Sequence, residues 1–228
     1  MRIEHIGDAT LILADCMDVM HDMPDKAFEV AIIDPPYGIG GERLNQGAGK
    51  LRGRAIQILN AGFDDDPPGA EYFAELERVS KNRIIWGANY FDLPPTRGII
   101  CWDKCQPWPN FSQIEIAWTS FDIPAKLIRI DNRTGGKIHP TQKPVALYKW
   151  LLKNYTKPGD KILDTHGGSG SSVIACLDMG FEITWIEKDP DYFEAALKRI
   201  KDFAAQPKLP MDDTPEPVEQ WLGFEEEL

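Results

Sequence analysis

Two consecutive prolines directly after an apolar run constrain this chain more than any other feature. The run Phe28–Ile33 predicts a buried strand, and Asp34, Pro35, Pro36 and Tyr37 follow it. Proline has no N–H for a strand ladder and disfavours helix at the residue before it, so the chain must leave the sheet here. In open α/β sheets, ligands bind beyond the carboxyl ends of the strands. This corner therefore places a carboxylate, backbone carbonyls and an aromatic ring at a candidate binding edge.

The last third of the chain alternates predicted strands and helices. The segments Lys161–Asp164 and Glu182–Glu187 predict strands, and Gly170–Met179 and Pro190–Phe203 predict helices. Such a β-α-β-α unit pairs its strands in parallel through a right-handed crossover. We therefore expect an α/β fold of the Rossmann-like type, with a mostly parallel central sheet and helices on both faces.

Further elements are predicted around this unit. We expect a short strand pair or ribbon at Ile6–Ala14, helices at Cys16–Met23, Glu71–Lys81 and Val145–Tyr155, and strands at Arg83–Trp86, Gly98–Trp102, Gln113–Thr119 and Lys126–Ile130. Between the prolines and the helix at Glu71, the stretch Gly38–Gly62 is polar and rich in glycine. A stretch of that length predicts a functional or disordered loop.

Composition narrows the class of protein. A chain of 228 residues with 43% hydrophobic and 27% charged residues is typical of one globular domain. Its apolar runs are shorter than the roughly 20 residues of a membrane span, and its first residues do not resemble a signal peptide, so the cytoplasm is the expected location. The four cysteines are scattered without a CxxC pair, which argues against a zinc or other metal site.

The charge distribution leaves a nucleic-acid partner open. The net charge of −11 argues against one, but from Asp202 to Leu228 eight acids stand against one lysine. Two segments are locally basic, and they supply candidate DNA-phosphate contacts: Arg43, Lys50, Arg52 and Arg54 in the first, and Lys126, Arg129, Arg133 and Lys137 in the second. The alternative is that these are ordinary solvated charges.

A glycine-rich turn follows the strand predicted at Lys161–Asp164. Its glycines let the backbone approach a ligand, and the helix that follows starts with unpaired N–H groups. Glu187 ends the next strand, 17 positions after Gly170. In Rossmann-like folds an acid at about this spacing hydrogen-bonds ribose hydroxyls. The pair indicates a nucleoside-type cofactor, although the turn lacks the GxGxxG pattern of dinucleotide sites.

A polar segment precedes the helix predicted at Val145–Tyr155. It runs His139-Pro140-Thr141-Gln142-Lys143-Pro144, and its two prolines preorganise a loop at the start of the helix. Near the other end of the chain, Asp15 and Cys16 follow an apolar run in the same way that Asp34 does. Asp15 can act as the N-cap of the helix that follows.

Together these segments resemble the motifs of the DNA amino-methyltransferases, which methylate adenine N6 or cytosine N4 with S-adenosylmethionine. The residues Asp34-Pro35-Pro36-Tyr37 resemble motif IV, and Glu187 and Asp15 resemble the acids of motifs II and III. The 139–144 segment resembles motif X at all six positions. The glycine turn is similar to motif I at Asp164, Gly168, Ser169 and Gly170, whereas Thr165 and His166 stand where proline and phenylalanine are usual.

The order of the motifs resembles the β group of this family, in which the cofactor half follows the catalytic half. The resemblance implies one domain over residues 1–203. Its parts would be a catalytic half at 1–100, a compact target-recognition segment at 103–137 and a cofactor half at 139–203, followed by an acidic, proline-containing tail at 204–228. A target-recognition segment this short implies a short site, relaxed specificity or help from a second subunit in a homodimer.

The resemblance also implies which residues bind the cofactor. They are Asp15, Cys16, His139, Thr141, Lys143, Asp164, His166, Gly168, Ser169, Gly170 and Glu187. Thr141 would supply a hydroxyl and Lys143 a cation for the carboxylate at the methionine end. For His166, packing in the place of the usual phenylalanine is an equal alternative to a cofactor contact.

The resemblance implies a mechanism at the first corner. The Asp34 carboxylate and the Pro35 carbonyl would accept the amino hydrogens of a flipped base, and Tyr37 would stack on that base. Aspartate at the first position favours adenine N6 over cytosine N4. Cytosine N4, an RNA or protein substrate, and a non-catalytic relative that only binds DNA are the alternatives.

Overall fold

The computed structural model describes residues 1–39, 66–106, 112–133, 137–139 and 141–207. Its strands are β1 (Arg2–Ile6), β2 (Ala9–Leu13), β3 (Phe28–Ile33), β4 (Ser80–Trp86), β5 (Ile99–Asp103), β6 (Ile114–Thr119), β7 (Lys126–Arg129), β8 (Lys161–Asp164) and β9 (Glu182–Glu187). Its helices are α1 (Cys16–His21), α3 (Ala70–Val79), α4 (Val145–Tyr155), α5 (Ser171–Met179) and α6 (Pro190–Ala204). Most of the predicted loop at Gly38–Gly62 and most of the predicted tail lie outside the described residues.

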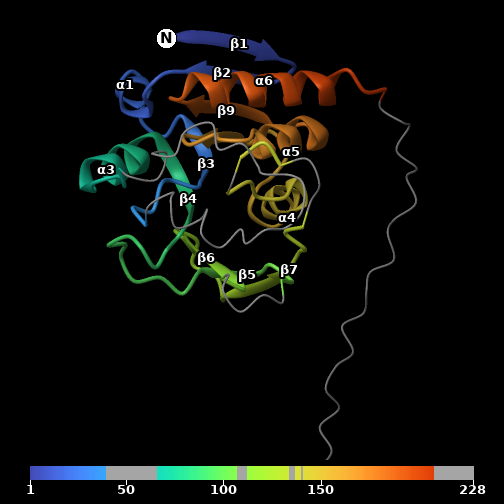
Figure 1. The fold of residues 1–228 in the computed structure, drawn as a ribbon. Coiled ribbons are helices and arrows are strands. Elements are labelled where there is room, and N and C mark those ends of the chain that lie inside the picture. The colour runs from blue at the N-terminus through green and yellow to red at the C-terminus, as the bar shows by residue number, and fades with distance from the viewer. Residues whose placement is uncertain (40–65, 107–111, 134–136, 140, 208–228) are drawn as a thin grey trace, which may run out of the picture.

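The described strands form one sheet in the order β1-β2-β9-β8-β3-β4-β6-β5-β7 (Figure 1). The strands from β2 to β4 in that order all pair in parallel, so their carboxyl ends share one edge. Strand β6 is antiparallel to both β4 and β5, and β7 is parallel to β5. The start of β6 and the ends of β5 and β7 therefore point to that same edge. This geometry decides which residues can meet there.

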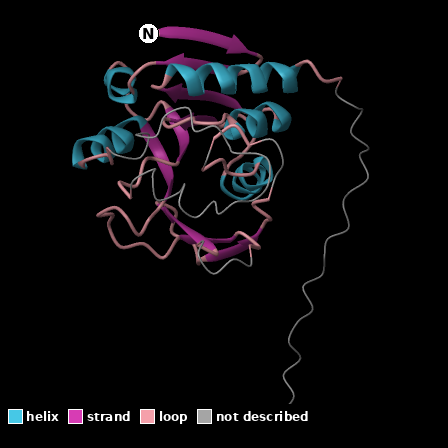
Figure 2. Cartoon of the chain, in the orientation of Figure 1, coloured by secondary structure: helices cyan, strands magenta, loops and turns pink. Residues whose placement is uncertain are grey.

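Helices cover both faces of the sheet, with α1 and α3 on one side of β3 and β4 and with α4 and α5 on the other (Figures 1 and 2). Strand β3 explains the arrangement, because successive side chains point to opposite faces. Val30 and Ile32 pack in the core under α4, α5 and α6. Ala31 and Ile33 pack in the core under α1 and α3. Burial on both faces is the reason that this strand is a nearly continuous apolar run.

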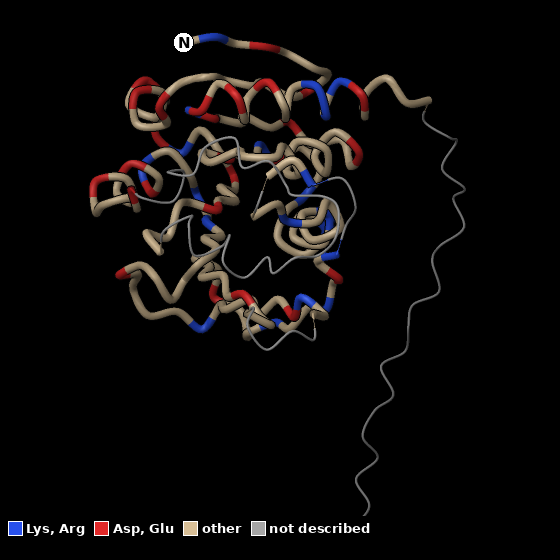
Figure 3. Tube along the Cα trace, in the orientation of Figure 1, with Lys and Arg blue, Asp and Glu red and all other residues tan. Residues whose placement is uncertain are grey.

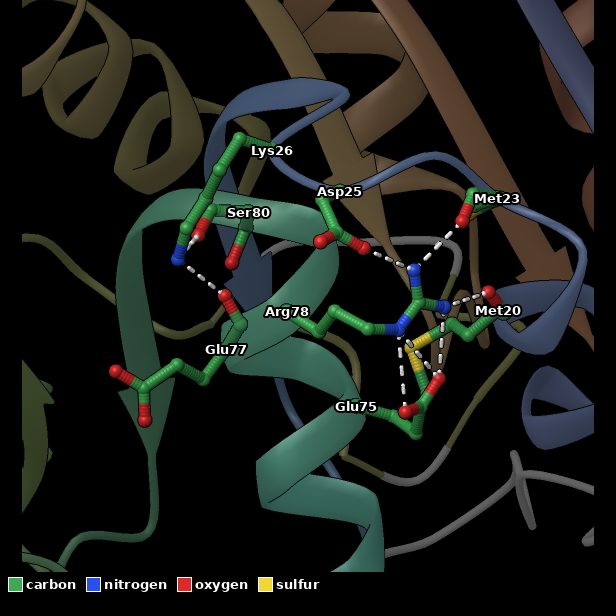
Figure 4. A network of polar contacts seen from close by, with 8 residues as sticks. All are labelled: Met20, Met23, Asp25, Lys26, Glu75, Glu77, Arg78 and Ser80. Carbon is green, nitrogen blue, oxygen red and sulfur yellow. Dashed lines mark hydrogen bonds and ion pairs between the residues drawn. The ribbon is translucent and has the colours of Figure 1, made fainter.

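Arg78 links helix α3 to helix α1 and to the residues that follow α1 (Figure 4). Its guanidinium donates to the carbonyl oxygens of Met20 and Met23, each at 2.7 Å, and pairs with the carboxylates of Asp25 and Glu75 at 2.8 Å. One planar group with several donors can join this many acceptors at once. The contacts fix the connection that leads into β3, and so they help to hold the position of Asp34.

The predicted α/β fold with a mostly parallel sheet and helices on both faces is confirmed. The ribbon predicted at Ile6–Ala14 is wrong in extent, because the structure has a hairpin that starts at Arg2 and turns at Gly7, which adopts a φ of +54°. Strand β1 is an edge strand that exposes residues along its length, so its apolar signal is weak. The other elements differ from the prediction only at their ends. Among the described residues, no helix is long and apolar enough to cross a membrane.

Candidate active site

A cavity of about 490 Å³ lies at the edge where the parallel strands end. Its wall includes residues that follow β2, β3 and β8, the last residue of β9, and the segment 139–143. The predicted site residues in this wall are Asp15, Cys16, Asp34, Pro35, Pro36, Tyr37, His139, Thr141, Lys143, His166, Gly168, Ser169 and Glu187. The volume is in the range of small-molecule sites in proteins. The fold therefore joins the predicted catalytic corner and the predicted cofactor residues in one cavity.

The glycine turn, Thr165–Gly170, packs tightly over strand β9. A Cβ added to Gly167 would lie 1.9 Å from the side chain of Trp185, which is fully buried. Gly168 and Gly170 adopt positive φ angles of 50° and 70°, and Gly170 is the N-cap of α5. Such φ angles favour glycine. The turn brings main-chain atoms of Gly167 and Gly168 to the cavity wall without side chains in between.

Glu187 is held by the backbone at the end of β9. Its Oε2 accepts a hydrogen bond from the N–H of Gly168 and its Oε1 from the N–H of Asp189, each at 2.8 Å. Burial raises the pKa of the carboxyl group, while the two backbone hydrogen bonds oppose that rise. Each carboxylate oxygen keeps a further lone pair, so Glu187 can accept hydrogens from a ligand hydroxyl. Its contact with a ribose stays a prediction.

Asp164 and Gly170 do not line the cavity, and their contact with a cofactor stays a prediction. Asp164 is 2% exposed and lies behind the turn. Its carboxylate accepts the Ser172 hydroxyl at 2.5 Å and the His166 N–H at 3.2 Å, and burial raises its pKa to about 7. A buried carboxyl group needs such donors. The role of Asp164 in this structure is to join the glycine turn to the start of α5.

His139 and residues 141–143 border the cavity from a different part of the chain. His139 is buried and its ring lies 4.3 Å from the ring of Tyr192, centroid to centroid. The hydroxyl of Thr141 lies 3.0 Å from Nδ1 of His139. Burial lowers the pKa of His139 to about 4, and the nearby Lys143 adds to that shift. His139 is therefore neutral near pH 7 and shapes the loop rather than supplying charge.

Two open sequence readings are both visible in the structure. Asp15 lines the cavity and is also the N-cap of α1, because its side chain accepts the N–H of Met17 at 2.8 Å. His166 lines the cavity and also packs against Tyr72, with ring centroids 5.2 Å apart. Burial lowers the pKa of His166 to about 3. These two residues combine a structural contact with a place in the cavity wall.

The carboxylate of Asp34 is engaged on both oxygens. Its Oδ1 accepts the hydroxyl of Tyr37 at 2.5 Å, and its Oδ2 lies 2.5 Å from Nζ of Lys143. The Lys143 side chain is only 3% exposed, and its ammonium lies between Asp34 and Glu115. The contact of Lys143 with a cofactor carboxylate stays a prediction. A buried ammonium requires a partner, and here Asp34 and Glu115 are those partners.

One face of the Tyr37 ring is already covered. Tyr90 stacks on it with ring centroids 4.8 Å apart and an interplanar angle of 14°. Gly87, at the end of β4, makes room for the ring, since a Cβ there would lie 2.2 Å from Cε1 of Tyr37. Stacking of Tyr37 on a base stays a prediction.

Sequence reasoning missed Glu115 and Lys104, which complete a charge cluster with Asp34 and Lys143. Nζ of Lys104 lies 2.7 Å from Oε2 of Glu115, and Nζ of Lys143 lies 2.6 Å from Oε1. The hydroxyl of Tyr37 lies 2.8 Å from the same Oε1, within hydrogen-bond distance. Only the sheet topology reveals this cluster, because its members come from four separated segments. Gln142, Thr165, Gly167, Tyr148, Lys188, Asp189 and Tyr192 also line the cavity without having been predicted.

The predicted DNA contacts are only partly placed. Arg43, Lys50, Arg52 and Arg54 lie outside the described residues. Lys126 begins β7 and Arg129 ends it, so Arg129 points to the cavity edge of the sheet and Lys126 to the opposite edge. Around β5, β6 and β7 both signs of charge are interspersed (Figure 3).

Several of these basic side chains already have partners. Arg129 pairs with Asp103 at 2.9 Å, and Arg133 pairs with Asp131 at 2.6 Å. Lys137 is half-buried and donates to the side chain of Asn132 at 2.9 Å, and burial lowers its pKa. The structure thus brings Lys137 close to the charge cluster rather than to an open basic face. Among the residues that the structure describes, no cluster of histidines, cysteines and acids is arranged to hold a metal ion.

Comparison with known proteins fits this geometry. The sequence model of the N6/N4 DNA methylase family matches residues 102–198. The type II methyltransferase M2.MboI of Moraxella bovis is 25% identical over 237 aligned residues, which cover 81% of this chain and 85% of that protein. The type II methyltransferase M.HinfI of Haemophilus influenzae is 24% identical over 267 aligned residues, which cover 91% of this chain and 73% of that protein.

In sequence, the chain is therefore similar to the DNA N6/N4 amino-methyltransferases.

Solved structures agree at the level of the fold. The M1.HpyAVI–SAM complex superposes with a TM-score of 0.55 at 20% identity, over 84% of this chain and 99% of that one. The cytosine-N4-specific PvuII DNA methyltransferase gives a TM-score of 0.57 at 12% identity, over 86% and 91% of the two chains. The family match spans the 139–144 segment, the glycine turn and Glu187, while the Asp34 corner lies outside the matched residues. The assignment of that corner therefore depends on its own geometry.

Proposed function

We propose that the protein transfers a methyl group from S-adenosylmethionine to the N6 amino group of a flipped adenine in DNA. The observation that carries this proposal is that Asp34 and Glu187 share one cavity of about 490 Å³. One side of the cavity offers hydrogen-bond acceptors suited to a nucleoside, and the other offers a carboxylate and a backbone carbonyl suited to an exocyclic amino group. Either side alone would indicate only the binding of one ligand. Both sides in one cavity favour transfer of a group between two ligands.

The cofactor half of the cavity fits S-adenosylmethionine. Glu187 would accept the ribose hydroxyls, and the carboxylate of Asp15 would accept the adenine amino group. The main chain at Gly167 and Gly168 can come close to the ligand because no Cβ intervenes. When bound, S-adenosylmethionine supplies an electrophilic methyl group on a sulfonium. Lys143 is left out of this set, because its ammonium is committed to Asp34 and Glu115.

The catalytic half activates the amino group of the base. The lone pair of an aromatic amine is delocalised into the ring, so the nitrogen is a weak nucleophile. The carboxylate of Asp34 and the carbonyl oxygen of Pro35 would accept its hydrogens and favour a tetrahedral nitrogen. Transfer to a positive methyl group needs placement more than acid–base chemistry, which is why one fixed carboxylate suffices. Because the target atom is hidden inside a duplex, the base must be extruded into the cavity.

The contact with DNA is proposed at a coarser level. Arg129 is exposed at the cavity edge of β7, where it can approach a phosphate after leaving its partly buried partner Asp103. Exposed pairs of this kind are weak. Within the second predicted basic segment, Lys126–Lys143, the structure thus supports a phosphate contact at Arg129 rather than throughout. A homodimer and a cytoplasmic location remain predictions from the sequence.

Mass spectrometry of nucleosides tests the proposal. Unmethylated DNA, as duplex and as single strand, is incubated with the protein and S-adenosylmethionine and then digested. The expected product is N6-methyladenine. N4-methylcytosine would keep the fold and the cofactor but overturn the choice of base. Absence of any methylated base would contradict the proposal and favour an RNA or protein substrate, or a role in binding alone.

A further inference from the structure

Four separated segments of the chain meet at the carboxylate of Asp34. Lys104 follows β5, Glu115 is the second residue of β6, and Lys143 precedes α4, while Asp34 itself follows β3. Because β6 runs antiparallel to β4 and β5, its first residues lie at the edge where the parallel strands end. The meeting is therefore a consequence of the sheet topology, and the side chains of the cluster are largely buried.

The Tyr37 hydroxyl has more acceptors than it has hydrogens. It lies 2.5 Å from Oδ1 of Asp34 and 2.8 Å from Oε1 of Glu115, yet a phenol donates only once. When the hydroxyl donates to Asp34, it takes a lone pair of Oδ1 that could otherwise accept a hydrogen of an amino group. When it donates to Glu115, that oxygen of Asp34 is left free to accept. Glu115 thus provides a second place for the same hydrogen.

The two carboxylates of the cluster are not equivalent. Among the described residues, Glu115 has two cations, Lys104 at 2.7 Å and Lys143 at 2.6 Å, whereas Asp34 shares Lys143 alone. Burial opposes ionisation of Glu115, but Lys143 and Lys104 outweigh it and lower its pKa. Burial raises the pKa of Asp34, with Lys143 opposing and Glu115 adding to the rise. Glu115 therefore stays charged while the charge of Asp34 depends on its neighbours.

We propose that Glu115 is a positioning residue for methyl transfer. It holds Lys143 against Oδ2 of Asp34, and it takes the Tyr37 hydroxyl so that Oδ1 of Asp34 is released to the amino group of the target base. This inference rests on the proposed function and assigns a role to a residue that does not line the cavity. Only hydrogen bonds change in this step, so no proton or electron pair leaves the cluster.

The charge of Glu115 also sets the pH at which Asp34 becomes an acceptor. Transfer requires the carboxylate form of Asp34, so the rate falls on the acid side as that group is protonated. The groups that face Asp34 are Tyr37 on its own loop, Glu115 on β6, Lys143 before α4, Tyr148 on α4 and Asp164 on β8, with Lys104 and Lys137 beyond Glu115 and Lys143. Among these, Glu115 is the nearest negative charge that can be removed without changing the cavity wall.

The first test is the pH–rate profile of single-turnover methylation. Glu115→Gln removes a negative charge near Asp34, so the acid limb should move to lower pH by roughly one unit. Lys104→Met removes a positive charge from the same cluster, so the limb should move to higher pH. The matched control is Glu182→Gln, because Glu182 also pairs with a lysine, at 3.1 Å, but on the exposed far end of β9. The control should leave the profile unchanged, and the KM for S-adenosylmethionine should stay the same in all variants.

A shorter acidic residue at position 115 separates the effect of the charge from the effect of the side-chain length. Glu115→Asp keeps the charge but withdraws it from Tyr37, so the acid limb should stay in place while kcat falls by about tenfold. In a Tyr37→Phe background no hydroxyl needs to be moved, and Glu115→Asp should then cost less than it does alone. Equal costs in both backgrounds would contradict the transfer of the hydroxyl.

A readout without turnover keeps the inference testable if a variant is inactive. The carboxyl ¹³C resonance of Asp34, identified by its loss in Asp34→Asn, reports the pKa of that group directly. It should titrate at lower pH in Glu115→Gln than in the natural chain. If the protein is active but Glu115→Gln changes neither the acid limb nor the titration of the Asp34 resonance, this inference alone is overturned. If Glu115→Gln shifts the resonance but the natural chain methylates nothing, the proposed function is overturned and the positioning role with it.

Discussion

The two halves of the cavity hold their polar groups by different means. In the cofactor half, Glu187 is fixed by two backbone N–H groups and Asp15 by the N–H of Met17. In the catalytic half, Asp34 is fixed by a lysine and a tyrosine, and the lysine in turn by Glu115. Backbone N–H groups do not titrate and have fixed positions, whereas side-chain partners can change their protonation state and rotate.

The difference matches what each half must do. A site for one small ligand benefits from acceptors that are preorganised by the main chain. A site that must accept hydrogens from an incoming base needs a carboxylate that stays charged in a buried place and can exchange one partner for another. The following variants test whether the halves are separable in this way, from the largest expected effect to the smallest.

Gly167→Ala should disrupt the cofactor half most strongly. The added methyl group would lie 1.9 Å from the buried ring of Trp185, so the glycine turn must shift. We expect the affinity for S-adenosylmethionine, measured by isothermal titration calorimetry, to fall by on the order of 100-fold or more. Gly69→Ala is the control, because nothing lies within 4 Å of its added Cβ. Unchanged affinity in Gly167→Ala would show that the turn does not shape the cofactor site.

Glu187→Gln should weaken cofactor binding less severely. The amide places a donor where a carboxylate oxygen now accepts from Gly168 or Asp189, so one of these N–H groups loses its acceptor. The unpaired N–H destabilises the glycine turn, and the variant also loses one acceptor for the proposed ribose hydroxyl, so the affinity should fall by roughly tenfold or more. Titration calorimetry measures this affinity, and the position of the acid limb of the rate should not move. A moved limb would mean that the two halves are coupled.

Asp15→Ser should give the smallest effect and decides between two readings of this residue. Serine caps a helix about as well as aspartate, so the melting temperature should stay within a degree or two. It lacks the carboxylate, so the affinity for S-adenosylmethionine should fall by roughly fivefold if Asp15 contacts the adenine. Thermal unfolding and calorimetry on the same sample provide both values. Equal affinity in the variant would leave Asp15 with the capping role alone.

The same contrast explains how far the sequence alone could predict this protein. The strand before Asp34, the glycine turn and Glu187 depend on residues close together in the chain, and those elements and their shared edge were predictable. Glu115 carried no signal, because it stands at the start of an ordinary strand and gains its partners only when β6 is placed antiparallel beside β4. The ion pairs of Lys143 were not predictable for the same reason. Its motif gives its position in the loop, but one acid that pairs with it follows β3 and the other lies on β6.

The most direct test of the account is the single-turnover rate of methyl transfer in Asp34→Asn at saturating S-adenosylmethionine. The amide oxygen replaces the carboxylate and leaves the cofactor half of the cavity unchanged. We expect the rate to fall by on the order of 10²–10³-fold, the usual cost of removing a group that stabilises developing charge. Calorimetry on the same variant should give a cofactor affinity within about twofold of the natural chain. A rate close to that of the natural chain would contradict the assignment of Asp34 as the group that accepts the amino hydrogens of the base.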